Sequence, residues 1–219
     1  MSNPINNVVE KLIINNPGSA ALVCTGYNRR FLTKFPSSAG AVFITGQTAY
    51  LLVDFRYAEA ARKKAQDCEV ILFESMNATL TELIKKHNIK SVYLEIESLP
   101  VSSAQRYERL FDDLNVETVI DESLDEVLMQ IRMIKSDEDV RKIQEAQKIT
   151  DAAFDHVIKY IKEGVTEKEI ALEIEFFMKR NGAEALAFDS IVAAGKNGSM
   201  CHAVPSGYKI QKGDFITMD

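Results

Sequence analysis

The sequence predicts an α/β domain with a mixed sheet and flanking helices over residues 1–131, followed by an α+β region over residues 132–219. Three observations lead to this division. Short apolar runs alternate with amphipathic stretches through the first region, which is typical of helices layered on a sheet. Two of these runs are joined by a loop short enough for a hairpin, so the sheet should include antiparallel strands. Near residue 132 the alternation gives way to long helical patterns.

The first region should hold strands and helices in regular alternation. Apolar runs bounded by turn residues predict strands at 20–25, 41–45, 49–54, 69–73, 91–95 and 116–120. Stretches rich in Ala, Arg, Lys, Leu and Glu predict helices at 55–66, 78–87 and 102–114. The second and third strands, with Gly46 and Gln47 between them, form the expected hairpin.

Two helices should open the second region. Ser136 is a suitable N-cap for the first helix, which should end at Gly164. Thr166 and Glu169 have the spacing of a capping box, and the pair at 181–182 suits the end of the second helix. The apolar positions expected to be buried are Val140, Ile143, Ala146, Ala153, Phe154, Val157 and Ile161 on the first helix and Ile170, Ile174 and Phe177 on the second. Residues 188–194 and 215–218 are strand candidates, with a Gly-rich loop at 195–199.

The composition excludes several classes of partner. Of the 219 residues, 46% are hydrophobic and 26% are charged, as in ordinary globular proteins. The net charge of -6 argues against a nucleic-acid partner, which requires clustered Lys and Arg. No apolar stretch approaches the roughly 20 residues of a membrane span, and the N-terminus lacks the pattern of a secretion signal. We therefore expect neither a nucleic-acid nor a membrane partner.

The cysteines indicate a reducing environment. Cys24, Cys68 and Cys201 are odd in number and have no C-x-x-C spacing. This pattern argues against a disulfide framework or a structural zinc site, and favours a cytoplasmic protein. Each Cys is expected to be a small buried hydrophobe.

Three histidines are the first candidates for chemistry. His87 should lie at a solvated helix end, and His156 should be a surface or half-buried helix residue. His202 differs because it follows a Gly-rich loop and precedes Ala-Val-Pro, so it is either a functional or a structural imidazole. A Cys201–His202 nucleophile pair is rejected, because adjacent side chains of an extended segment point to opposite faces.

Asp219 follows the last apolar run, where it is either a metal ligand or an ordinary turn residue. A catalytic metal needs about three protein ligands, and Asp219 is the one well-placed candidate in this segment. The glycines at 195 and 198 do not make a phosphate-binding spelling, so nucleotide binding has no support.

Two stretches resemble a known family. "FDSIVAAGKNGSMCHAVPSGYKIQKGDFITMD" is similar to the first half of the pita-bread catalytic domain of creatinase, prolidase, aminopeptidase P and methionine aminopeptidase. "FLTKFPSSAGAVFITGQTAYLLVDFRYAEAA" resembles the creatinase-type N-terminal domain, which points to the proline-directed branch. The match departs at Lys34, Pro36 and Ser37, where a Gly-rich spelling is usual.

The resemblance implies a fold and a set of residue roles. It implies a creatinase-like domain over 1–131 and an incomplete pita-bread domain over 132–219. His202 matches the catalytic His that hydrogen-bonds the substrate and the tetrahedral intermediate, and Phe188 resembles an aromatic residue of the substrate pocket. Asp219 matches the first ligand of two divalent ions, usually manganese, cobalt or zinc, which activate the hydroxide that attacks the bond before proline.

The other ligands of the family lie beyond the matching stretch. We therefore expect an Xaa-Pro peptidase-like chain that alone binds no dinuclear metal tightly and has no peptidase activity. The alternative is a non-catalytic binding or oligomerisation protein, or a pseudoenzyme of the same family. The resemblance also implies proline-containing peptides as substrates of the full-length protein, and a homodimer.

Overall fold

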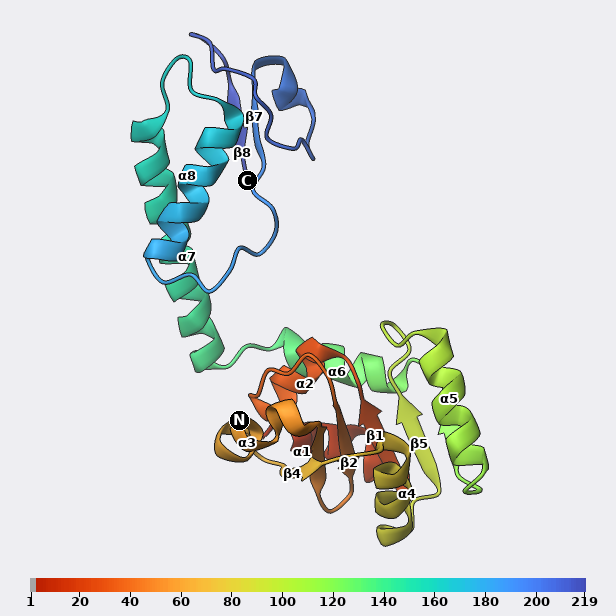
Figure 1. Cartoon of the computed structure of the whole chain (residues 1–219). Helices are drawn as coiled ribbons and strands as arrows, with labels where there is room; N and C mark the ends of the chain where they lie inside the picture. The colour runs from red at the N-terminus through yellow and green to blue at the C-terminus, as the bar shows by residue number, and fades with distance from the viewer. Residues whose placement is uncertain (1–2) are drawn as a thin grey trace. The chain divides into compact units, whose positions relative to one another are not determined.

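The computed structural model describes residues 3–219, and the chain divides into two compact units, Met1–Ile134 and Lys135–Asp219. We call them the N-terminal unit and the C-terminal unit, and describe each by itself (Figure 1). The boundary lies three residues after the predicted one at 131, because helix α6 (Ser123–Met133) continues to the end of the N-terminal unit.

A mixed six-stranded sheet forms the centre of the N-terminal unit, as the sequence predicts. Its strands are β1 (Ser19–Val23), β2 (Ala41–Thr45), β3 (Ala49–Val53), β4 (Glu69–Leu72), β5 (Ser91–Leu94) and β6 (Glu117–Val119). Their order is β4-β3-β2-β1-β5-β6. The β1–β2 and β2–β3 pairs are antiparallel, which confirms the hairpin, and the other three pairs are parallel.

Helices cover both faces of this sheet. They are α1 (Pro4–Val8), the π-helical turn η1 (Val9–Ile13), α2 (Gly26–Thr33), α3 (Phe55–Lys64), α4 (Met76–Lys86), α5 (Val101–Asp112) and α6. The helices α3, α4 and α5 were predicted, whereas α1, η1, α2 and α6 were not. A local signal for α1 does exist: Asn3 caps it by accepting from the Ile5 N–H at 2.8 Å, and Pro4 stands at its first position.

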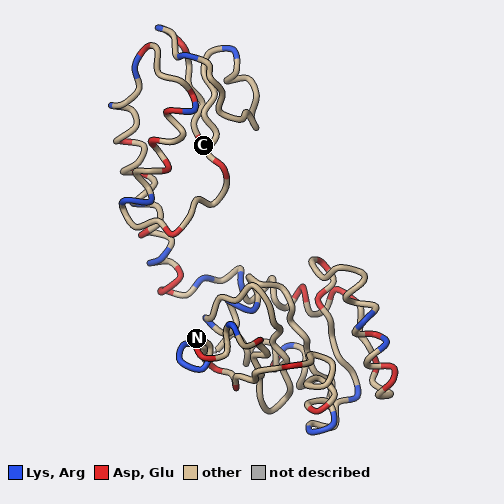
Figure 2. The backbone as a smooth tube through the Cα atoms, in the orientation of Figure 1, with Lys and Arg blue, Asp and Glu red and all other residues tan. Residues whose placement is uncertain are grey.

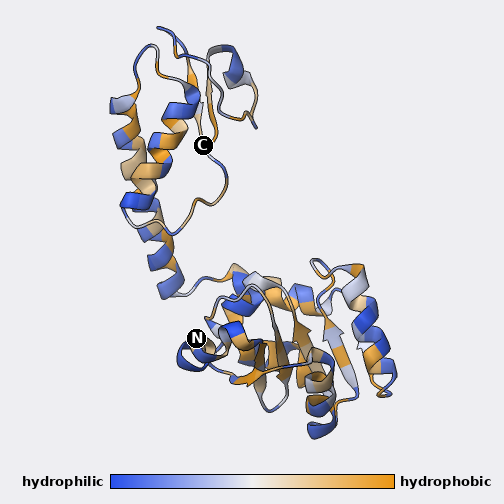
Figure 3. Cartoon of the chain, in the orientation of Figure 1, coloured by the Kyte–Doolittle hydropathy of each residue, from blue (hydrophilic) through white to orange (hydrophobic). Residues whose placement is uncertain are grey.

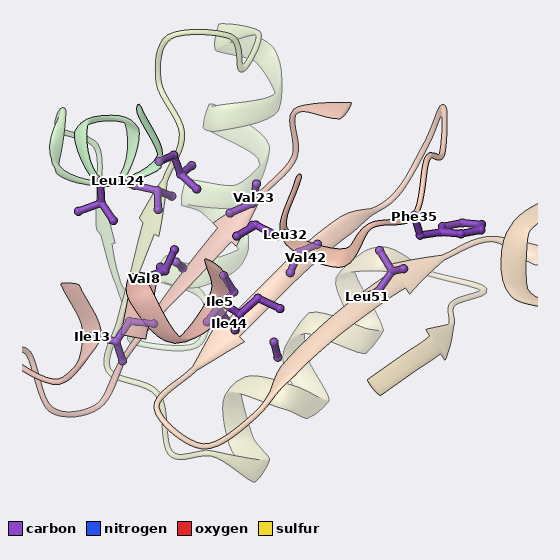
Figure 4. Close-up of a cluster of buried hydrophobic side chains, with 14 of the residues drawn as sticks. Ile5, Val8, Ile13, Val23, Leu32, Phe35, Val42, Ile44, Leu51 and Leu124 are labelled. Atoms are coloured by element: carbon purple, nitrogen blue, oxygen red, sulfur yellow. The ribbon is translucent and has the colours of Figure 1, made fainter. Parts of the chain in front are cut away.

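The central strands are buried on both sides because successive side chains point to opposite faces. Val23, Val42 and Ile44 belong to one core with residues of α1, η1, α2, α3 and α6 (Figure 4). Leu22 and Phe43 belong to the other core, with residues of α4 and α5. Covering of both faces explains why these strands are continuously apolar instead of alternating.

Lys34 ends helix α2 in the left-handed conformation, with φ of 56°. This is one of the positions where the resemblance led us to expect Gly, so the turn keeps a glycine-like backbone without the glycine. A left-handed L-residue is strained, since its Cβ crowds the following carbonyl. We expect Lys34→Gly to raise the free energy of unfolding by about 0.5–1 kcal/mol, measured by urea titration.

Lys34→Ala is the matched control, because it removes the same long side chain and its contact with the Phe31 ring but keeps a Cβ. It should bring none of the gain. Equal gains from both variants would show that the lysine side chain, and not the backbone, is the unfavourable feature.

The C-terminal unit consists of two helices and a short two-stranded sheet. Its elements are α7 (Asp137–Tyr160), α8 (Glu167–Arg180), β7 (Val192–Ala194), the 3-10 turn η2 (Gly195–Ser199) and β8 (Ile216–Met218). Both predicted caps are confirmed: Ser136 with Asp139, and Thr166 with Glu169, form capping boxes. The predicted loop at 195–199 is a 3-10 turn, and α7 ends at Tyr160, before Gly164.

The predicted buried face of α7 is wrong over much of its length. Ala153 and Val157 are buried, but Val140, Ile143 and Phe154 are exposed. Helix α8 has 14 residues and α7 has 24, so α8 can pair with only part of the longer helix. On α8, Ile170 is buried as predicted, whereas Ile174 and Phe177 are half-buried. Figure 3 shows orange faces on both helices.

Charges and hydropathy add two general features. Basic and acidic residues are interleaved along the backbone of both units (Figure 2). Within residues 3–219, no helix combines the length and the apolar character that crossing a bilayer requires.

Candidate functional site

The strand pair β7–β8 carries Asp219 at its end. The two strands are antiparallel, and beyond them Ile191 and Asp219 exchange both backbone hydrogen bonds, at 2.8 and 3.0 Å. Asp219 is exposed, so its carboxylate is available to a ligand. Phe188 precedes Ile191 by three residues and is 56% exposed. Both positions are open to solvent, and their roles as metal ligand and pocket aromatic remain predictions.

His202 lies in a turn that follows η2. The Met200 N–H donates to the Asn197 carbonyl at 2.9 Å, and the Ala203 N–H donates to the Met200 carbonyl at 3.1 Å. These bonds place Cys201 and His202 in a tight turn with both residues exposed. The imidazole is therefore accessible from solvent, which a reactive histidine requires and a buried structural one would not show.

Glu167 is hydrogen-bonded to residues on both sides of this segment and was not among the predicted site residues. It is 1% exposed and accepts four hydrogen bonds. Its Oε1 accepts from the Ala194 N–H at 2.7 Å and from Asn197 Nδ2 at 3.0 Å. Its Oε2 accepts from the Ser206 N–H at 2.9 Å and from Ser206 Oγ at 2.5 Å. One carboxylate thus joins the first turn of α8 to both sides of the segment that carries His202.

The local sequence around Glu167 indicates a helix start and gives no sign of a role at the site. It directly follows the capping residue Thr166, where an acidic residue is explained by the helix dipole alone. Its four hydrogen-bond donors belong to three residues that lie 27 to 39 positions away, so no local pattern could reveal them.

Close contacts with the 208–214 segment, which precedes β8, also hold η2 in place. Gly195 has φ of 54°, and a Cβ built there would lie 2.8 Å from Tyr208 Oη and 2.9 Å from Asp214 Oδ1. Tyr208 Oη donates to Asp214 Oδ2 at 3.1 Å, which holds these two side chains in place. Only glycine fits this close approach without displacing them. The start of η2 is therefore held against the 208–214 segment.

The Glu167 carboxylate should make the C-terminal unit sensitive to acid. Burial raises the pKa of Glu167, but hydrogen bonds from Ser206, Ala194 and Asn197 outweigh it and hold the pKa below the ordinary value of 4.5. Because the folded pKa is depressed, this stabilisation is present above about pH 4.5 and is lost as pH falls through the folded pKa. Unfolding followed through the amide signals of α8 should show this loss. In Glu167→Gln the loss over this range should shrink, whereas an unchanged profile would contradict the assignment.

The cysteines differ in exposure: Cys24 and Cys68 are only half-buried, and the expectation of burial is wrong for Cys201. Cys201 is exposed and lies in the turn that follows η2. Burial, with the charge of Glu95 second, raises the pKa of Cys24 to about 12. Burial, with the charge of Asp67 second, raises the pKa of Cys68 to about 11.

A thiol reagent such as a disulfide dye at mildly alkaline pH should therefore modify Cys201 first, since the thiolate is the reacting form and must be accessible. We expect one rapid phase, which the variant Cys201→Ser abolishes. Rapid reaction of two or more thiols in the folded chain would contradict this prediction.

The other two histidines have partners that the sequence did not reveal. His87 Nε2 lies 2.8 Å from Tyr50 Oη, and burial together with Lys86 lowers the pKa of His87. The predicted solvated helix end is thus half-buried, because Tyr50 reaches it from β3. His156 is half-exposed as predicted; its Nε2 lies 2.7 Å from Glu173 Oε1, and its ring stacks on Phe177 at 4.4 Å.

The described residues do not by themselves form a metal centre. Across the described part of the chain, no group of three or more His, Cys, Asp or Glu side chains is placed to hold a metal ion. Asp219 therefore has no companion ligands among residues 3–219. A pair of metal ions therefore does not fit the side chains of residues 3–219.

Two family models together match nearly the whole chain. The creatinase/prolidase N-terminal domain matches residues 13–134, and metallopeptidase family M24, whose members depend on two metal ions, matches residues 141–219. The chain is 32% identical over 219 residues to an Xaa-Pro dipeptidase of Pyrococcus horikoshii, covering 98% of this chain and 60% of the relative. It is 34% identical over 199 residues to the uncharacterized peptidase YqhT of Bacillus subtilis, covering 90% of this chain and 55% of the relative.

Solved structures show the same likeness. An Xaa-Pro dipeptidase from Bacillus anthracis superimposes with a TM-score of 0.89 at 30% identity, over 99% of this chain and 59% of that one. The prolidase from Pyrococcus horikoshii gives a TM-score of 0.84 at 30% identity, over 100% of this chain and 60% of that one. The chain thus spans between 55% and 60% of the length of these relatives. This coverage agrees with the expected creatinase-like domain and incomplete pita-bread domain.

Proposed function

Since this chain belongs to the creatinase and prolidase family, we propose that the whole protein is a metallopeptidase that hydrolyses the amide bond before proline. The observation that carries this proposal is the combination of two domains. A creatinase-type N-terminal domain precedes an M24 segment here, and the same stretch aligns with an Xaa-Pro dipeptidase over 98% of this chain. We propose further that these 219 residues by themselves lack the activity, because residues 3–219 supply no cluster of metal ligands.

Three residues are this chain's proposed contribution to the site. His202 would hydrogen-bond the substrate and the tetrahedral intermediate, and its ring nitrogens suit this role because they can donate or accept. Phe188 would line the substrate pocket, and its 56% exposure leaves the ring free for that contact. Asp219 would contribute one carboxylate to the metal centre of the whole protein, and its exposure at the end of β8 is compatible with this.

Finer features of the proposal rest on the family resemblance. The two ions are proposed to be manganese, with cobalt or zinc as alternatives, and carboxylate ligands such as Asp219 suit manganese. The substrates would be peptides with proline in the second position. A cytoplasmic homodimer is proposed, and the three unpaired cysteines favour a reducing compartment.

The first test uses this chain as it stands. The 219-residue chain is incubated with manganese and Xaa-Pro di- and tripeptides, beside the Pyrococcus horikoshii Xaa-Pro dipeptidase as the active control. We expect turnover by the control alone, and no tight manganese binding by the chain in calorimetry. Two manganese ions bound at about micromolar affinity would contradict the proposed inactivity.

The second test uses the protein isolated from its own cells, weighed by mass spectrometry and assayed with the same peptides. A mass above 24.5 kDa with manganese-dependent cleavage before proline would support the peptidase. A mass of 24.5 kDa without cleavage would instead favour the non-catalytic binding or oligomerisation protein.

A further inference from the structure

The segment that carries His202 is closed at its base by one side chain. Asn197 and Ser206, on either side of it, both donate to the Glu167 carboxylate, at 3.0 Å for Asn197 Nδ2 and 2.9 Å for the Ser206 N–H. Residues 198–205 therefore form a loop whose two ends meet on a helix. Holding both ends lowers the conformational entropy of this loop.

We propose that Glu167 is a positioning residue for His202, acting by clamping both ends of the 198–205 loop to the first turn of α8. Its carboxylate is 1% exposed, and each oxygen serves one end of the loop: Oε1 accepts from Ala194 and Asn197, and Oε2 accepts both donors of Ser206. The significance of this clamp for catalysis rests on the function proposed above for His202.

The four hydrogen-bond donors around Glu167 require a side chain that accepts at both oxygens, which is a carboxylate. Ala194 and Asn197 present N–H donors to Oε1, and Ser206 presents a backbone N–H and a hydroxyl to Oε2. A carboxylate accepts at both oxygens, whereas an amide accepts at one and donates at the other. Glutamine at this position would set its NH2 group against an N–H donor at one end of the loop, whichever way it turned.

Contacts with the 208–214 segment further restrict both ends of the loop. Gly195 packs against Tyr208 and Asp214, so the start of η2 cannot shift toward the 208–214 segment without a clash. Ser206 Oγ also accepts from the Tyr208 N–H at 3.0 Å, which continues the hydrogen bonds from Glu167 into that segment. When Glu167 releases one end, the loop and His202 gain freedom while the β7–β8 pair remains.

The test compares Glu167→Gln with the unaltered 219-residue chain by NMR. In Glu167→Gln we expect the amide at one end of the loop, Ser206 or Ala194, to exchange about tenfold faster or more. The His202 ring signals, identified with a His202→Asn variant, should move toward those of an unstructured histidine. Amides of α7 should keep their exchange rates.

Two further variants keep the test decisive. Glu163→Gln removes an exposed carboxylate just before α8 and should change none of these signals. Asn197→Ala removes one donor and no core side chain, so it should stay folded and loosen the η2 end even if Glu167→Gln fails to fold.

The outcomes separate this proposal from the peptidase function. Unchanged His202 and loop signals in folded Glu167→Gln or Asn197→Ala would overturn it. So would faster exchange spread evenly over the whole C-terminal unit, because that would show a general loss of stability. None of these readouts needs turnover, so an inactive whole protein with a loosened loop would refute only the peptidase.

Discussion

Replacing Glu95 with alanine is expected to lower the free energy of unfolding of the N-terminal unit by about 3–5 kcal/mol. Glu95 directly follows β5, is 1% exposed, and accepts three hydrogen bonds at the start of α2. The donors are the Cys24 N–H at 2.5 Å, the Thr25 N–H at 2.8 Å and Asn28 Nδ2 at 2.7 Å. Cys24 and Thr25 lie directly before the first residue of α2, and the acceptor for both N–H groups is a side chain at a distant strand end.

The loss should exceed that of three ordinary hydrogen bonds because a buried cation depends on the same carboxylate. Arg29 is 4% exposed and donates to the Cys24 carbonyl and, at 2.7 Å, to the Ser37 carbonyl. Burial lowers the pKa of Arg29, and the negative charge of Glu95 opposes this. Without Glu95 the guanidinium would remain buried with little compensating charge, which is costly.

Tyrosine fluorescence during urea unfolding can report this effect, because five of the seven tyrosines lie in the N-terminal unit and the chain has no tryptophan. The matched control is Glu97→Ala, two residues further along and exposed, which should change the stability by less than about 0.5 kcal/mol. Similar losses from both variants would show that the Glu95 hydrogen bonds contribute little.

The same contacts explain why α2 could not be predicted. The strands were predictable because continuous apolar runs carry their own signal, and both faces of the sheet are covered. Helix α2 has eight residues and includes Gly26, Asn28 and Thr33, which are weak helix formers. Its stability comes from the burial of Leu32 and from Glu95, which lies 67 residues after Asn28. Contacts over such distances are not visible in a local pattern.

The candidate site shows the same division between local and distant information. His202, Phe188 and Asp219 were assigned through family resemblance, and the structure places all three where solvent reaches them. Glu167 was hidden because its local context, a helix first turn, already explained its charge. The buried face of α7 was predicted wrongly for a related reason. The spacing of apolar residues predicts which face of a helix is apolar, but not which neighbour covers it.

Gly40→Ala is the second change with a large expected effect, a loss of about 3–4 kcal/mol or more in the N-terminal unit. Gly40 has φ of 115°, a conformation that L-residues rarely adopt. A Cβ at this position would also lie well inside 3.0 Å of the Leu52 carbonyl oxygen. Leu52 is the partner of Ala41 in the β2–β3 pair, so the strained residue directly precedes the first paired residue of β2.

The two costs of Gly40→Ala cannot be relieved separately. Rotating φ to a negative value would turn the chain away from the register of β2, while keeping φ would press the methyl group into a backbone oxygen that cannot rotate aside. Gly46, at the other end of β2, is the matched control: its φ is not positive, and an added Cβ would meet only Ile13 Cγ2 at 3.7 Å. Gly46→Ala should therefore be neutral or slightly stabilising in the same urea titration. Comparable losses at Gly40 and Gly46 would mean that chain flexibility, and not the close approach to Leu52, determines the requirement for glycine.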